Sequence, residues 1–141
     1  MEYSKKFYSQ LDDFRKSLIS FNRVLRKDLS LLNADDKDTF ENAQIHKFEI
    51  CTEIIWKTLK LFIEESGVVV EASYPKEYIK KSFQLGLTDS VLIEGLMDMI
   101  DDRNKMSHIY NEDYFRDILE YLPKHFENMN QVLTIIESKI K

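Results

Sequence analysis

Apolar side chains recur every three or four positions along most of this chain, and charged side chains fill the positions between them. This spacing places the apolar residues on one face of an α-helix. The first such run comprises Tyr3, Phe7, Leu11, Phe14, Leu18, Phe21, Leu25 and Leu29. In the polar interruption that follows, Asp38 and Glu41 have the spacing of a capping box, so we expect a second helix to begin there and to end near Gly67.

The predicted second helix is apolar over more than one face. Its main stripe comprises Phe48, Cys51, Ile55, Leu59 and Phe62, and Ile50, Ile54, Trp56 and Ile63 widen it. A helix with so broad an apolar arc lies at the centre of a fold or lines an interface. Residues 68–70 are three valines, but no other segment offers a partner strand, so we interpret them as an extended connection.

A short third helix and a longer fourth helix follow. Pro75 suits the first position of the third helix, and Gly86 would end it in the left-handed conformation. Asp89 or Ser90 then opens the fourth helix. Its apolar stripe is Leu92, Leu96 and Met99. The next position of that stripe is Arg103, an arginine where the pattern requires a core residue.

The last helix is predicted to begin at an N-cap, Asn111, and Pro123 should kink or divide it. Its apolar stripe comprises Phe115, Ile118, Leu122, Phe126, Met129, Leu133, Ile136 and Ile140. Four long helices with short connections, together with one short helix, predict an all-α, up-and-down helical bundle. A chain of 141 residues fits a single domain, which we expect to span 1–141.

The charge of the chain restricts how it can bind a nucleic acid or a nucleotide. The chain has 20 Lys and Arg against 25 Asp and Glu, which gives a net charge of -5. Any site for RNA or a nucleotide must therefore be a local basic pocket.

The single cysteine, Cys51, falls in an apolar segment, which favours a buried thiol in a reducing compartment. No segment is apolar over the length that the core of a signal peptide or a membrane-spanning helix requires. We therefore expect a cytoplasmic protein that does not enter a membrane.

The segment 101–110 is the densest in functional groups, with two acids, two bases, an amide, a hydroxyl, an imidazole and a phenol. Arg103 and His108 lie five residues apart, which on a continuous helix is about 140° around the axis. Their side chains converge only if the helix ends between them or if two chains contribute. The polar run and the expected N-cap at Asn111 favour a helix end.

Arginine and histidine together suit phosphodiester chemistry. A guanidinium binds phosphate through two hydrogen bonds and keeps its charge, and an imidazole takes or gives a proton near neutral pH. Because the 2′-hydroxyl of RNA is a built-in nucleophile, such a pair can cleave RNA without a metal or cofactor, and we expect neither. The alternative is a structural role, with Arg103 in an ion pair to Asp101 or Asp102 and His108 as an ordinary turn residue.

The motif from Arg103 through His108 to Tyr110, Arg-x4-His-x-Tyr, resembles the signature of HEPN-domain ribonuclease toxins from toxin–antitoxin pairs. The resemblance extends over about residues 40–123. It includes Phe48-Glu49, Trp56-Lys57, the segment PKEYIKKSFQLGL at 75–87, and Asp102-Arg103-Asn104. In these segments the sequence resembles the branch of the HEPN family that is known as nucleotidyltransferase substrate-binding proteins.

This resemblance implies a HEPN-like bundle that forms a homodimer, with one composite cleft for RNA. In that arrangement Arg103 binds the scissile phosphate, His108 is the general acid or base, and Asn104 orients one of them. The implied partner is a minimal nucleotidyltransferase that acts as antitoxin by transferring AMP to Tyr110. A phosphate there would occupy the anion site and repel RNA.

Two alternatives remain open from the residues. One is that the chain is a non-catalytic subunit that binds substrate for a separate nucleotidyltransferase. The other concerns Trp56, which belongs either to an interface with a second chain or to the core. His46 and His125 have no partner that the sequence identifies, so we interpret both as surface or structural residues.

Overall fold

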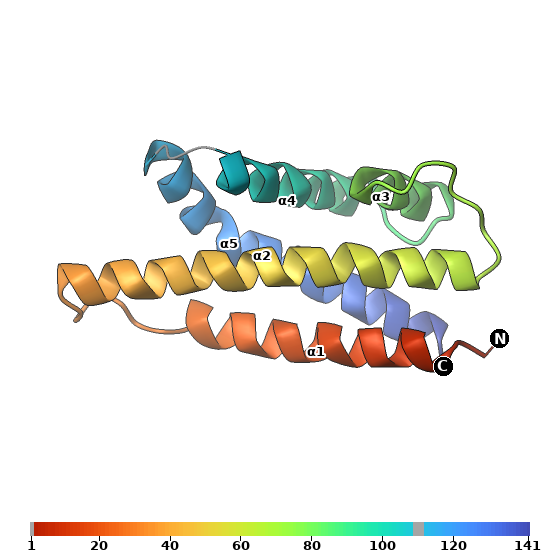
Figure 1. The fold of residues 1–141 in the computed structure, drawn as a ribbon, viewed down its shortest axis with the longest axis horizontal. Helices are drawn as coiled ribbons and strands as arrows, with labels where there is room; N and C mark the ends of the chain where they lie inside the picture. The colour runs from red at the N-terminus through yellow and green to blue at the C-terminus, as the bar shows by residue number, and fades with distance from the viewer. Residues whose placement is uncertain (1, 109–111) are drawn as a thin grey trace.

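The computed structural model describes residues 2–108 and 112–141, without the side chains of 107 and 108. Five helices account for most of this part of the chain (Figure 1). They are α1 (Lys5–Leu25), α2 (Ala34–Glu65), α3 (Pro75–Gln84), α4 (Ser90–His108) and α5 (Glu112–Lys139). Residues 68–70 are irregular, and no strand occurs among the described residues. The prediction of an all-α bundle with four long helices and one short helix is confirmed.

The second helix begins earlier than its sequence pattern predicted. Asn33, in extended conformation, is the N-cap of α2, and its side-chain oxygen accepts a hydrogen bond of 2.8 Å from the Asp36 N–H. The predicted capping box at Asp38 and Glu41 is therefore wrong. Two acidic residues, Asp35 and Asp36, fill the first turn, where negative charge stabilises the free N–H groups of a helix.

The boundaries of α3 and α4 follow the predicted signals. Pro75 begins α3, and Gly86 has a φ of 74°, a left-handed conformation that favours glycine. The Asp89 carboxylate accepts a hydrogen bond of 2.7 Å from the Leu92 N–H, so Asp89 caps α4. These two residues turn the chain between the short helix and the helix that carries the candidate site.

The last helix, α5, continues through Pro123, so the proline does not divide it, and the alternative that it kinks the helix stays a prediction. A proline inside a helix costs about 3 kcal/mol, because it removes one hydrogen bond and crowds the preceding turn. Burial of the neighbouring Leu122 and His125, both 0% exposed, holds the helix against that cost. The predicted N-cap Asn111 lies outside the described residues.

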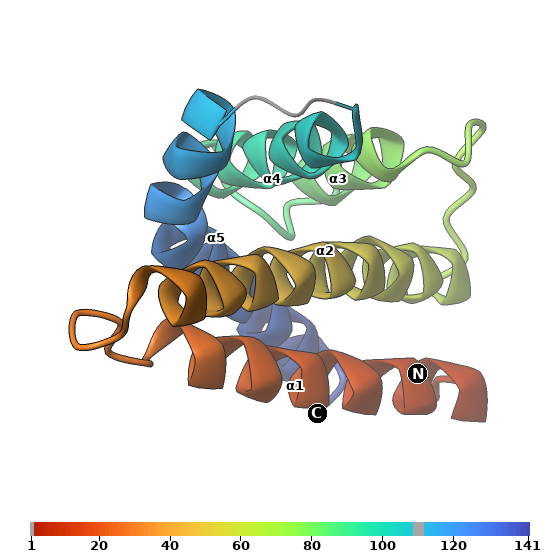
Figure 2. The same cartoon turned by 60° about the vertical axis from the view of Figure 1, so that its left-hand side comes forward.

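Helix α2 is the centre of the bundle. In both views α1 runs along one side of α2, and α3 and α4 lie on the other side (Figures 1 and 2). Helix α5 crosses behind α2 and contacts α1, α2 and α4. All five residues of the main α2 stripe are buried, which confirms the central position that the broad apolar arc allowed. None of the helices described is long and apolar enough to cross a membrane.

A buried polar pair joins α4 to α5. His125 is 0% exposed, and its Nε2 lies 2.6 Å from an Asp102 carboxylate oxygen. The imidazole stacks on the Phe48 ring with centroids 4.9 Å apart and meets the edge of Tyr121 at 4.8 Å. Of the two roles that the sequence left open for His125, surface or structural, the structure shows the structural one. Asp102 thus gives a buried ring nitrogen the partner that water cannot provide.

Removing this partner should destabilise the bundle. We expect Asp102→Ala to lower the free energy of unfolding by about 1–3 kcal/mol, because it leaves the buried imidazole of His125 without a partner. The adjacent Asp101→Ala is the matched control. Asp101 pairs with Lys76 at the surface, where both side chains are more than 40% exposed, so its loss should cost about 0.5 kcal/mol or less. Urea unfolding of the two variants measures the difference, and equal losses would contradict the structural role of the buried pair.

Candidate functional site

Helix α4 remains helical through the whole segment from Arg103 to His108. The prediction that a helix end separates these two residues is therefore wrong. Their backbone positions lie about 140° apart around the axis of one helix. Asn104 is exposed. Tyr110 lies outside the described residues, as does the side chain of His108, so the convergence of the four predicted site residues stays a prediction.

Arg103 forms an ion pair with Glu53 on α2. Its Nη2 lies 2.8 Å from Glu53 Oε2, and the two side chains are 35% and 32% exposed. The sequence had offered Asp101 or Asp102 as the structural partner of Arg103, but these carboxylates bind Lys76 and His125 instead. The guanidinium therefore lies at the boundary between the core and solvent.

The Glu53 carboxylate is also bound by Lys57, whose Nζ lies 3.1 Å from Oε1. Burial by itself raises the pKa of Glu53. The nearby indole of Trp56, the hydrogen bond from Lys57 and the charge of Arg103 outweigh burial and hold the pKa below its ordinary value. The Trp56 N–H is buried and makes no hydrogen bond within the described part of the chain, so we attribute its effect to a nearby dipole. Glu53 is consequently ionised at neutral pH.

The sequence analysis did not identify Glu53, although one signal marked it. Glu53 interrupts the broad apolar arc of α2, as Arg103 interrupts the stripe of α4. Two charged residues that break neighbouring apolar stripes are candidates for a pair, because each offsets the cost of burying the other. Trp56 lies within α2 opposite α3, with its ring centroid 6.4 Å from that of Tyr78.

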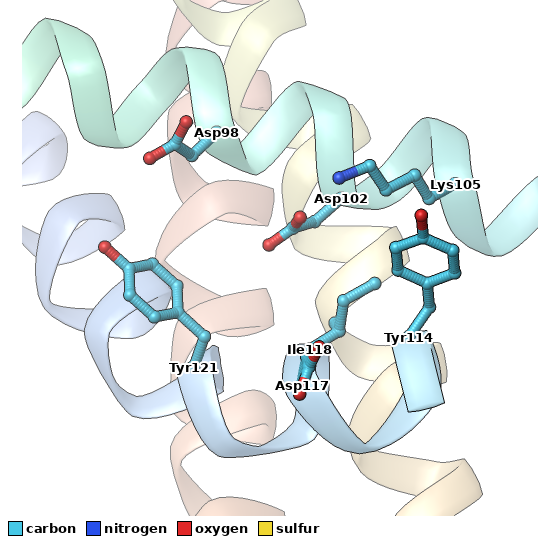
Figure 3. A pocket seen from close by; sticks show the side chains of 7 residues that line it. All are labelled: Asp98, Asp102, Lys105, Tyr114, Asp117, Ile118 and Tyr121. Carbon is cyan, nitrogen blue, oxygen red and sulfur yellow. The ribbon is translucent and has the colours of Figure 1, made fainter. Parts of the chain in front are cut away.

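A second face of α4 borders an open pocket of about 280 Å³. Figure 3 shows its walls, which come from α4 and from the first turns of α5. The lining residues are Asp98, Asp102, Lys105, Tyr114, Asp117, Ile118 and Tyr121. Three carboxylates against one ammonium make this pocket acidic, and Lys105 Nζ lies over the Tyr114 ring at 5.5 Å from its centroid. The pocket is therefore unsuited to bind a phosphate.

An ion pair between Arg116 and Glu41 joins the start of α5 to α2. Arg116 binds both oxygens of the buried Glu41, with Nη2 2.8 Å from Oε1. The hydrogen bonds from Arg116 lower the pKa of Glu41 and outweigh the opposing effect of burial. The helices on both sides of 109–111 are thus anchored on the same central helix.

Within the described ranges, no group of three His, Cys, Asp or Glu side chains is arranged to hold a metal ion.

Three solved structures share this fold over almost their whole length. A crystal structure of a protein from Thermus thermophilus is 29% identical, with a TM-score of 0.74, and the match covers 87% of this chain and 98% of that one. A tri-AMPylated HEPN toxin of Shewanella oneidensis, in complex with its MNT antitoxin, is 18% identical with a TM-score of 0.78. That match covers 96% of this chain and 98% of the toxin.

The third structure is a mutant of the toxin–antitoxin pair MntA–HpeT, 16% identical with a TM-score of 0.73, covering 94% of this chain and 98% of that one. No match was found among curated proteins. The model of the family described as nucleotidyltransferase substrate binding protein like matches residues 9–138, nearly the entire chain. This protein, whose fold is that of the HEPN toxins, therefore belongs to the nucleotidyltransferase substrate-binding protein family.

Proposed function

We propose that this protein is the toxin of a HEPN and minimal nucleotidyltransferase pair, and that it is a metal-independent endoribonuclease. In this proposal Arg103 binds the scissile phosphate, and His108 transfers protons. Asn104 orients one of these groups, and Tyr110 accepts AMP from the antitoxin. The family match and the fold shared with two toxins of such pairs support the proposal.

The observation that carries the proposal is the continuity of α4 through His108. Because Arg103 and His108 occupy different sides of one helix, they serve one phosphate most directly when each comes from a different protomer. A homodimer with a composite cleft meets this condition. It also leaves Arg103 in reach of solvent on its own side of the helix, where it is 35% exposed.

The chemistry follows from these two groups. An imidazole removes the proton of a 2′-hydroxyl, the 2′-oxygen attacks phosphorus, and the bond from phosphorus to the 5′-oxygen breaks. The leaving oxygen takes up a proton, and the products carry a 2′,3′-cyclic phosphate and a 5′-hydroxyl. The guanidinium stabilises the additional negative charge on the phosphoryl oxygens in the transition state. General acid–base catalysis of this kind contributes about 10²–10⁴-fold.

The family name supports a second candidate, a non-catalytic subunit that binds substrate for a separate nucleotidyltransferase. In that case Arg103 binds a nucleotide phosphate without cleavage. The two functions differ in one measurable property, since only the ribonuclease breaks RNA when no nucleotidyltransferase is present.

Purified protein should cleave single-stranded RNA in the presence of EDTA. We expect Arg103→Ala and His108→Ala each to lower the rate at least about 100-fold, because each removes a group that acts in the transition state. Lys80→Ala, which removes a surface cation paired with Glu77 on α3, is the control and should leave the rate unchanged. Equal cleavage by all four proteins, or none by the unaltered protein, would reject the ribonuclease and favour the binding subunit.

Mixed dimers should test whether the site is shared. Neither Arg103→Ala nor His108→Ala alone should cleave RNA. When the two are refolded together, the mixed dimer retains one Arg103 and one His108 on different protomers. We expect RNA cleavage to reappear in that mixture, measured as 5′-hydroxyl ends. No recovery, with mixed dimers verified by mass, would place both groups in the same protomer.

Co-expression with the adjacent nucleotidyltransferase should add AMP to Tyr110. The phenolic oxygen loses its proton and attacks the α-phosphorus of ATP. The bond between the α-phosphorus and the oxygen that bridges to the β-phosphate breaks, and pyrophosphate leaves. Mass spectrometry should find an adenylyl group on Tyr110 and none after Tyr110→Phe. Tyr114→Phe is the matched control, since Tyr114 is a neighbouring exposed tyrosine and its loss should not affect the modification. Modification elsewhere with Tyr110 bare would contradict the assignment.

A further inference from the structure

One carboxylate joins two cations at the edge of the candidate site. Glu53 Oε2 binds Arg103 Nη2 from α4 at 2.8 Å, and Glu53 Oε1 binds Lys57 Nζ from the next turn of α2 at 3.1 Å. The guanidinium and the ammonium are therefore held on the two oxygens of one side chain. This arrangement brings together charges that come from two helices.

The three side chains remain open to solvent. Glu53 and Arg103 are about one third exposed, and Lys57 is 52% exposed. Two cations and one ionised carboxylate leave a net charge of +1 on a protein whose total charge is -5. The carboxylate offsets the repulsion between the two cations, which lets them stay close together without a bound anion.

The surroundings restrict where an RNA backbone can lie. The neighbouring face of α4 is acidic, with Asp98 and Asp102 beside Asp117 of α5 around the open pocket (Figure 3). A polyanion is repelled from that face and attracted to the face that carries Arg103 and Lys57. Helix α2 therefore places a second cation, Lys57, beside the one that α4 supplies.

We infer that Lys57 is a second ligand of the RNA backbone and that Glu53 is the positioning residue for both cations. This inference rests on the proposed ribonuclease function. Arg103, with its planar fork, takes the scissile phosphate, and Lys57, a compact point charge, takes a neighbouring phosphate. Glu53 acts through these two residues and does not touch the reacting atoms.

The role of Lys57 is tested by RNA binding as a function of salt. The probe is a single-stranded RNA with 2′-O-methyl groups, which binds but has no free 2′-hydroxyl to react. We expect Lys57→Ala to weaken binding about tenfold at low salt and to reduce the slope of log affinity against log salt by about 0.7, the loss of one phosphate contact. The matched control is Lys16→Ala, which breaks the Asp12–Lys16 pair with the same spacing on α1 and should leave the slope unchanged.

The role of Glu53 is tested by steady-state cleavage of unmodified RNA. Glu53→Gln keeps the shape of the side chain and removes its charge. We expect kcat to fall about tenfold because Arg103 loses its fixed orientation, whereas KM should stay the same or fall because a negative charge near the RNA is gone. Asp12→Asn is the control on α1, and thermal unfolding of each variant verifies that the bundle is intact. A simple loss of fold would instead lower the melting temperature and the active fraction without lowering KM.

The outcomes separate this inference from the proposed function. If the unaltered protein cleaves RNA and Lys57→Ala keeps the full salt slope, the inference about Lys57 is wrong and the ribonuclease stands. If Glu53→Gln keeps full kcat, Glu53 is not a positioning residue. If the unaltered protein neither binds nor cleaves RNA, the ribonuclease function itself is wrong, and the inference is wrong with it.

Discussion

Burial of α2 on several sides is the constraint on which the rest of this structure depends. The helix has 32 residues and packs against each of the other four helices. Its main stripe is fully enclosed, and its flanks meet α3 through Trp56 and Tyr78. Because apolar area removed from water is the largest stabilising contribution in a domain of this size, the arrangement around α2 determines where α4 and α5 can lie.

The charged residues of the candidate site depend on that arrangement. Three polar pairs cross between helices near the site: the ion pairs of Arg103 with Glu53 and of Arg116 with Glu41, and the hydrogen-bonded pair of Asp102 with His125. Two of them end on α2. A polar side chain near a core needs a partner, and these partners stabilise the last turns of α4 and the first turns of α5. The segment that carries the predicted site is thus bounded on both sides by helices with defined positions.

The same geometry divides α4 into faces of different character. One face is buried against the core, one carries Arg103 beside Glu53 and Lys57, and one borders the acidic pocket. In the proposed mechanism, the acidic face repels the RNA backbone and the face with Arg103 attracts it. A continuous helix also separates the backbone positions of Arg103 and His108, which is why a second protomer enters the proposed mechanism.

The periodicity of the sequence by itself determined the number of helices, the apolar face of each and several of their boundaries, because these depend on side chains within a turn or two of one another. It marked Arg103 as anomalous for the same reason, but it left His125 open as a surface or a structural residue. Only the tertiary structure decided that Asn33 caps α2, that α4 continues through His108, and that Glu53, fifty residues away, is the partner of Arg103. Competing caps differ by little free energy, and long-range pairs form only when packing brings separate helices together, so neither can be read from local pattern.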